Sequence, residues 1–168
     1  MMKSKIANLF ATYFGLGLSK FAPGTMGSLG TLPLAYALIY FGGFGALLIA
    51  AIIIFPLGVM ATHIVIKETR ITDPSKVVID ETVGQLLAFV PLAYVSINSL
   101  LGYESFAYYL CGFLFFRLFD IKKMGPVKYF DSRVLNAYGV MLDDVCAGIF
   151  AGICLYGVWH YHLLAWIY

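Results

Sequence analysis

Charged residues are scarce in this chain of 168 residues. Asp, Glu, Lys and Arg make up 12% of it, hydrophobic residues make up 61%, and the net charge is only +2. A soluble domain uses about 25% charged residues to cover its surface. The shortage excludes a water-soluble domain, a disordered chain and a basic nucleic-acid-binding domain, so no nucleic-acid partner is expected. The sequence therefore predicts an integral membrane protein.

Cysteine and histidine are also rare, with three of each. All three cysteines (111, 146 and 154) fall in apolar segments, and an odd number of cysteines inside lipid makes no disulfide framework. The histidines at 63, 160 and 162 are spread across opposite sides of the predicted bundle. We therefore expect neither a disulfide framework nor a histidine metal site.

Long segments without charge define the predicted membrane spans. No charged residue occurs in the 46 residues between Lys20 and Lys67, whereas one spanning helix needs about 20 residues. Two spans fit there, with a reversal at the glycine-rich residues 41–45. Unpaired backbone groups are costly in hydrocarbon, so each span should be helical. The expected spans are residues 28–40, 46–66, 82–103, 105–116 and 145–168, with a turn near 99–104.

The few charges are distributed very unevenly. All 11 Lys and Arg, and every acid except Glu104, lie in residues 1–27, 67–81 and 117–144. The positive-inside rule places these segments in the cytoplasm. Residues 1–14 combine lysines with apolar residues at helical spacing, which is typical of a helix lying in the membrane interface. The predicted fold is an all-α integral membrane protein with one domain, residues 1–168. It is a compact bundle of about five transmembrane helices plus an N-terminal interfacial helix.

Acidic residues gather where the predicted spans begin or end: Asp80 with Glu81, Asp120 with Asp131, and Asp143 with Asp144. Carboxylates at the edge of the hydrocarbon are usually paired or bound to a cation. Both adjacent pairs are expected to open their helices, where the helix dipole favours one negative charge but does not need a second. Several oxygens converging from different helices are what magnesium requires. The metal ligands predicted are Asp80, Glu81, Asp143 and Asp144.

Small residues follow the acids along the last span. Gly148 and Gly152 lie on one face, with Ala147 and Ala151 beside them, and Gly84 follows Asp80 by one turn. This pattern permits close helix packing. Packing alone would explain it, and so would a need to bring acids of two helices to one ion.

The segment 19–28 contains glycines and the hydroxyls of Thr25 and Ser28 just before the first span. Backbone amides at such a helix start can bind phosphate, although a Ser or Thr there is often only an N-cap. Basic residues on the same membrane face could bind a phosphate or anchor anionic lipid. The candidate substrate-binding residues are Lys20, Thr25, Ser28, Arg117, Lys123 and Lys128. Cys111 and Arg117 have a phosphatase-like spacing, but the residues between them lie in a span and form no phosphate-binding loop.

Four blocks resemble the bacterial phosphatidylglycerophosphatase A family: GLGLSKFAPGTMGS at 15–28, VIDETVG at 78–84, FRLFDIKK at 116–123 and GVMLDDVCAG at 139–148. The resemblance implies a magnesium-dependent phosphatase of the bacterial inner membrane that converts phosphatidylglycerophosphate to phosphatidylglycerol on the cytoplasmic face. Its substrate would be a membrane phospholipid. Carried over by position, the family's functional residues fall on Asp80, Glu81, Asp120, Asp143 and Asp144, with Thr25, Ser28 and Lys123.

Two questions stay open at this point. A magnesium-activated water is the preferred nucleophile, with an aspartyl-phosphate route as the alternative. The chief rival from another class is a small cation transporter or channel subunit that uses the same acids as ion ligands. The oligomeric state, the number of ions and the range of lipid substrates are not indicated.

Overall fold

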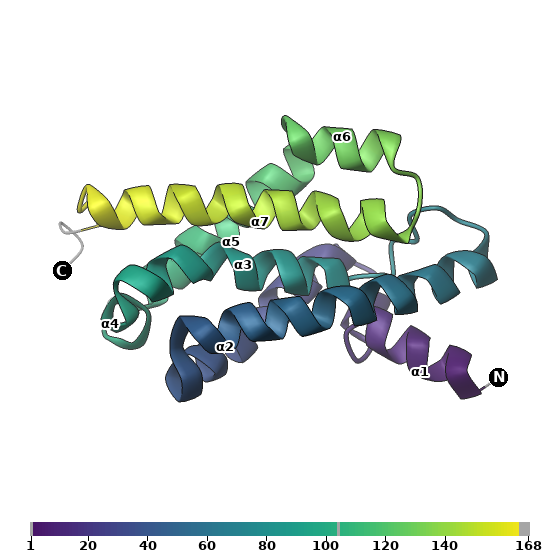
Figure 1. Ribbon diagram of the computed structural model, residues 1–168, viewed down its shortest axis with the longest axis horizontal. Helices are drawn as coiled ribbons and strands as arrows, with labels where there is room; N and C mark the ends of the chain where they lie inside the picture. Colours follow the sequence, from purple (N-terminus) through teal and green to yellow (C-terminus); the bar gives the residue numbers. More distant parts are fainter. Residues whose placement is uncertain (1, 104, 165–168) are drawn as a thin grey trace.

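The computed structural model describes residues 2–103 and 105–164, which form helices and turns and contain no strand. This confirms the all-helical prediction. In order along the chain, the elements are α1 (Met2–Ala11), the short 3-10 helix η1 (Leu16–Leu18), α2 (Pro23–Thr69), α3 (Ile79–Val95), α4 (Ile97–Leu101), α5 (Ser105–Lys122), α6 (Pro126–Arg133) and α7 (Ala137–His160). Figure 1 shows α3 and α7 lying side by side along the long axis of the molecule.

The long helix α2 consists of two arms, residues 23–42 and 44–69, which fold back on each other (Figure 1). The helical geometry is interrupted at Gly43, where φ is 62° and ψ is −154°. Residues other than glycine rarely adopt these backbone angles, so the glycine at this position permits the reversal. Gly27 of the first arm and Gly58 of the second both reach the start of α3, at Val78 and Ile79. The arms are therefore antiparallel, and the predicted reversal at residues 41–45 is confirmed.

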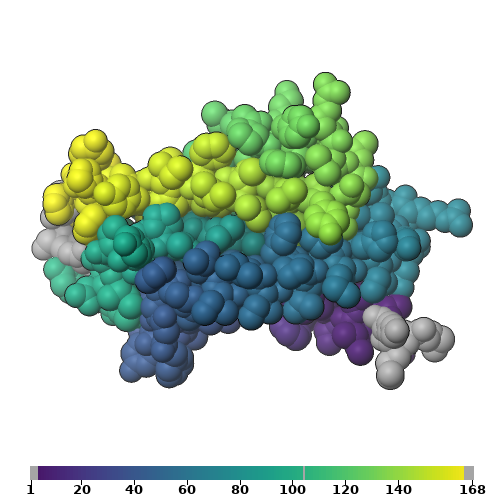
Figure 2. Space-filling model, in the orientation of Figure 1, coloured from purple at the N-terminus to yellow at the C-terminus, as the bar shows by residue number. Residues whose placement is uncertain are grey.

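Helix α3 lies at the centre of the molecule. Twelve of its 17 residues are buried, among them the large side chains of Leu86, Phe89 and Leu92. The second arm of α2, by contrast, exposes Ile49, Ile52 and other large apolar side chains. Figure 2 shows this arm, α3 and α7 side by side on one face. A central helix that is buried nearly all round can hold polar residues in fixed positions.

The contact between α3 and α7 is backbone to backbone. A Cβ atom added at Gly148 would collide with the carbonyl group of Gly84, and one added at Gly84 would lie 2.5 Å from the Asp144 carbonyl oxygen. Gly152 meets Pro91 further along, so the two helices run parallel. Ala147 and Ala151 are fully buried beside these glycines. The close packing predicted from the small residues is confirmed.

Two of the described helices, α2 and α7, are long and apolar enough to cross a membrane. The count of five spans stays a prediction. Helix α3 ends at Val95, before the predicted turn at 99–104, and the Ser96 and Ser99 hydroxyls share a hydrogen bond of 2.9 Å there. Glu104 lies outside the described residues. Helix α5 continues past residue 116 to Lys122, and α6 was not predicted.

Helix α1 packs on the bundle through its small residues. Ala7 and Ala11 are buried in one cluster with Val65 and Val77, while large apolar side chains of the same helix, such as Ile6, are exposed. This arrangement fits the predicted interfacial helix, whose larger apolar side chains would face lipid.

Candidate active site

A polar cavity of about 250 Å³ lies where α3 begins and α5 ends, beside the second turn of α7. Six carboxylates line it against two basic side chains, so the cavity carries a large excess of negative charge. The acids are Asp73, Asp80, Glu81, Asp120, Asp143 and Asp144, the bases are Arg117 and Lys123, and Ala22, Pro23, Gly24, Ser75, Val77 and Val140 complete the lining.

Three of the acids form one compact cluster. An oxygen from each of Asp80, Glu81 and Asp144 lies within 4.8 Å of the other two. Asp80 and Asp144 each precede by one turn the glycine at which α3 and α7 touch, Gly84 and Gly148. Because the helices run parallel, this contact brings the carboxylates together. The small residues therefore position the acids as well as allowing the helices to pack.

The cluster has the features of a site for a divalent cation. All three acids are buried, and the Glu81 Oε2 atom has no hydrogen-bond partner. Buried carboxylates in contact repel one another, and an unpartnered buried oxygen costs free energy. Hard oxygens at this spacing are the ligands that magnesium prefers. The residues present thus fit a magnesium ion.

Arg117 brings positive charge to the edge of the cluster. Its Nη1 atom lies 2.6 Å from Asp120 Oδ2 and 3.9 Å from Glu81 Oε1. Asp120 therefore forms an ion pair with the guanidinium group, although the buried Nε and Nη1 atoms have no hydrogen-bond partner. An arginine held in this way can bind the oxygens of a phosphate.

Gly24, at the start of α2, closes the site on another side. A Cβ atom at this position would collide with Glu81 Oε1 and lie 3.2 Å from Arg117 Nη1. Only glycine lets the backbone approach these two side chains so closely. The predicted segment 19–28 therefore reaches the cavity through Ala22, Pro23 and Gly24.

Lys123 joins the segment after α5 to α6 and α7. Its Nζ atom lies 2.7 Å from Asp131 Oδ1 and 2.7 Å from Asp143 Oδ2. Burial lowers the pKa of this ammonium group, but the two hydrogen bonds outweigh burial and raise the pKa above its ordinary value. Asp143 Oδ1 accepts a hydrogen bond from the Asp144 amide. Both oxygens of Asp143 are thus bound by the protein, and the structure does not bring this predicted ligand into the three-acid cluster.

One expectation about the acids is wrong. Asp80 and Glu81 lie in the first turn of α3, as predicted. Asp143 and Asp144 do not open their helix, because α7 begins at Ala137 and the Asn136 side chain caps it by accepting hydrogen bonds from the Tyr138 and Gly139 amides. The side-chain amide of Asn136 satisfies the free N–H groups without an acid. The carboxylates of α7 are therefore positioned by the contact with α3.

Four predicted substrate-binding residues lie outside the cavity lining. Lys20 and Lys128 are exposed, and Thr25 is half-buried. The Ser28 hydroxyl donates a hydrogen bond to the Gly24 carbonyl oxygen within the helix. Arg117, Lys123 and all five predicted acids do line the cavity.

Two polar residues of the cavity lining, Asp73 and Ser75, were not predicted. They lie in the charged segment 67–81, and an acid beside a proline, Asp73 before Pro74, was the available signal.

A family model and two relatives of known name point to the same protein family. A family model described as phosphatidylglycerophosphatase A matches residues 9–159. The chain is 36% identical over 156 residues to phosphatidylglycerophosphatase A of Haemophilus influenzae, covering 93% of this chain and 90% of the relative. It is 30% identical over 154 residues to the Escherichia coli protein of the same name, covering 92% and 84%.

A third relative, a candidate phosphatidylinositol-3-phosphatase of Bacteroides thetaiotaomicron, is 36% identical over 151 residues, covering 88% of this chain and 89% of the relative. No solved structure matches the chain.

Proposed function

Because the chain belongs to the phosphatidylglycerophosphatase A family, we propose that it hydrolyses phosphatidylglycerophosphate to phosphatidylglycerol and phosphate. The observation that carries the proposal is the buried cluster of Asp80, Glu81 and Asp144 beside Arg117. A phosphate monoester is anionic, so it can enter a cavity with six acids only if cations offset their charge. The proposed reaction is phosphoryl transfer to water.

Magnesium is the proposed cofactor, held by Asp80, Glu81 and Asp144. When bound there, it would offset charge on the phosphate oxygens and activate water for attack. Arg117, which is paired with Asp120, would bind oxygens of the phosphate. Lys123 fixes Asp143 and balances part of the remaining negative charge.

In the reaction, water attacks phosphorus and the bond to the glycerol oxygen breaks. On balance, the attacking water gives its hydroxide to phosphorus and one proton to the leaving glycerol oxygen, so the products are an alcohol and inorganic phosphate. Phosphoryl transfer needs positioning and charge stabilisation more than covalent chemistry by the protein. The paired arginine and the backbone at Gly24 supply that positioning.

The site is proposed to face the cytoplasm from a multi-pass protein of the bacterial inner membrane. The cavity lies at the end of the bundle formed by the predicted inner segments, which hold all 11 Lys and Arg. A lipid phosphate would lie at this level while its acyl chains remain in the leaflet. The apolar helices α2 and α7 support this placement.

Phosphate release tests the function. Purified protein in detergent micelles is mixed with phosphatidylglycerophosphate, with and without magnesium, and with phosphatidylinositol 3-phosphate in parallel. We expect magnesium-dependent release from the first lipid, which is lost in Asp144→Asn and kept in Glu68→Gln, an exposed acid outside the cavity. No release by the wild type would reject the proposal. Magnesium flux into sealed vesicles without hydrolysis would favour the cation transporter instead.

A further inference from the structure

An apolar groove of about 520 Å³ lies between the first arm of α2 and α5. Its walls are one face of each helix. Leu29, Leu32, Pro33 and Tyr36 follow the i, i+3, i+4, i+7 spacing on α2, and Phe106, Tyr109, Leu110 and Phe113 follow the same spacing on α5. Residues at this spacing share one side of a helix. The groove therefore runs continuously along one face of each helix.

The groove leads to the acidic cavity. On α5 the same face continues from Phe113 to Arg117 one turn later, and Arg117 lines the cavity. On α2 the face runs back from Leu29 through Thr25, one turn earlier, toward Ala22 at the cavity. One helical turn rises about 5.4 Å. Along α5 the apolar groove therefore ends about one turn from Arg117, and along α2 it ends about two turns from Ala22.

The groove is open along its side. Phe106 is 76% exposed and Leu110 is 44% exposed, although both are apolar. At the far end the rings of Tyr36 and Tyr109 lie 6.2 Å apart. Exposed apolar walls of this kind are stable in contact with hydrocarbon and costly in water.

We propose that this groove binds one acyl chain of the phospholipid substrate and so places the phosphate of that lipid at Arg117. The inference rests on the proposed function and adds the place where the lipid tail is held. An acyl chain fits because it is long, apolar and joined to an anionic headgroup, and the groove is long, apolar and ends at a cation. The substrate enters sideways from the membrane between α2 and α5.

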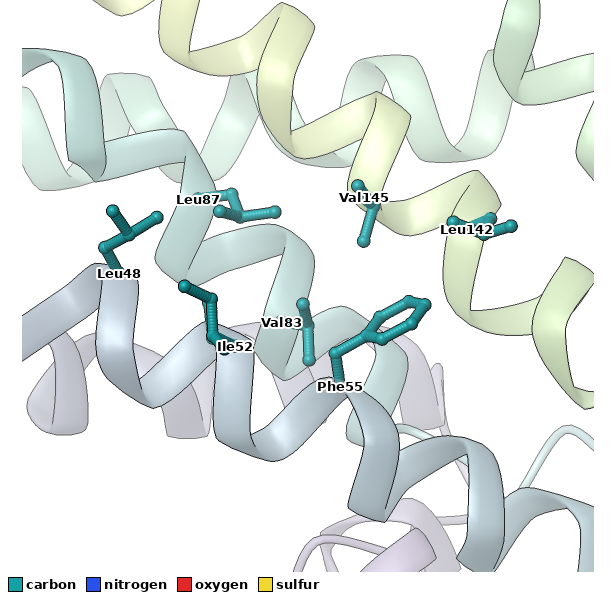
Figure 3. A pocket seen from close by; sticks show the side chains of 8 residues that line it. Leu48, Ile52, Phe55, Val83, Leu87, Leu142 and Val145 are labelled. Carbon is teal, nitrogen blue, oxygen red and sulfur yellow. The ribbon is translucent and has the colours of Figure 1, made fainter.

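A second apolar groove, of about 300 Å³, does not lead to either basic side chain of the acidic cavity. Figure 3 shows Leu48, Ile52 and Phe55 on one side of it and Leu142 and Val145 on α7. The second arm of α2, which forms that side, contributes no described residue to the acidic cavity. Leu142 lies about 160° around α7 from Asp144, given 100° per residue. On α3 its face reaches Val83, three residues after Asp80, but the helices that line it, α2, α3 and α7, carry neither Arg117 nor Lys123. This groove therefore brings no basic side chain to a lipid phosphate.

The first test fills the groove. Leu110→Trp is compared with Leu118→Trp, because Leu118 lies on the same helix with 45% exposure but does not line the groove. Phosphate release is measured with long-chain phosphatidylglycerophosphate and with its deacylated, water-soluble headgroup. We expect Leu110→Trp to lower the ratio of the two kcat/KM values about tenfold, a size that steric misfit in an apolar pocket produces. Leu118→Trp should leave the ratio unchanged. Equal ratios in both variants would overturn the inference while leaving the hydrolysis itself intact.

A second measurement does not depend on activity. A phosphate-monoester lipid with a photoactivatable acyl chain is cross-linked to the wild type, and labelled peptides are mapped by mass spectrometry. We expect label on residues 29–36 and 106–113 that unlabelled phosphate-monoester lipid competes away, and label near the exposed Ile53 that it does not. Equal competition at both places contradicts the inference. A change from dimer to monomer in Leu110→Trp would instead identify a second copy of the chain as the occupant.

Discussion

Two pairs of helices border the acidic cavity and pack in opposite ways. Helices α3 and α7 touch through the backbones of Gly84 and Gly148, with no room for a single added carbon atom. The first arm of α2 and α5 leave a groove of about 520 Å³ between them. The tight pair carries the acid cluster, whereas the open pair carries Arg117 and Gly24.

The difference separates two tasks of one site. Carboxylates that share an ion must keep their spacing, and closely packed helices without voids keep side chains in place. A lipid must enter and leave the site, which requires an apolar groove that is open toward the membrane and can hold an acyl chain. Under the proposed function, the tight helix pair would hold the ion and the open pair would admit the lipid.

The largest effect is expected from opening the tight pair. In Gly148→Leu the new side chain would meet the backbone of α3, which cannot move aside as a flexible side chain can. Overpacking costs about 1 to 3 kcal/mol in a typical core, and more where backbone must shift. We expect loss of folded protein or a clearly lower Tm in detergent, together with loss of hydrolysis. Gly157→Leu, at a position with nothing within 4 Å, is the control and should keep both.

A smaller change removes one ligand and leaves the packing intact. Glu81→Gln keeps the shape of the side chain but removes a charge from a crowded group of acids. We expect hydrolysis to fall by more than about a hundredfold, because loss even of an outer partner of a metal ligand costs 10- to 100-fold. The Tm should stay equal or rise as repulsion is relieved. Calorimetry should show weaker magnesium binding, and wild-type affinity in this variant would remove Glu81 from the site.

Much of the tight pair could be predicted from local pattern. Gly84 and Gly148 each follow an acid by one turn, and this spacing alone predicts a close contact below the carboxylates. The reversal at Gly43 was equally predictable, since three glycines interrupt an apolar run too long for one span. These features depend on residues near one another in the chain.

The rest depends on which segments meet in three dimensions. Asn136 caps α7 nine residues before Val145, where the apolar run that marked the predicted span begins, so the position of Asp143 within its helix was missed. The bond between Lys123 and Asp143 joins residues 20 apart, and no spacing rule predicts it. The end of α3 at Val95 was missed because the segment up to residue 103 carries no charge to mark it.

The smallest effect is expected on the open side, at Gly24. In Gly24→Ala the added Cβ would push on the Glu81 carboxylate, which is the movable end of a side chain, so stability should change little. The displaced Glu81 carboxylate would no longer keep its spacing from the Asp80 and Asp144 carboxylates. A shift of about 1 Å in a reacting group can lower the rate up to 100-fold. We expect a fall in kcat of about ten- to a hundredfold with an unchanged Tm, measured beside Gly45→Ala, where nothing lies within 4 Å. If Gly24→Ala instead kept full activity, the start of α2 would not confine the acids, and the tight helix pair alone would set their geometry.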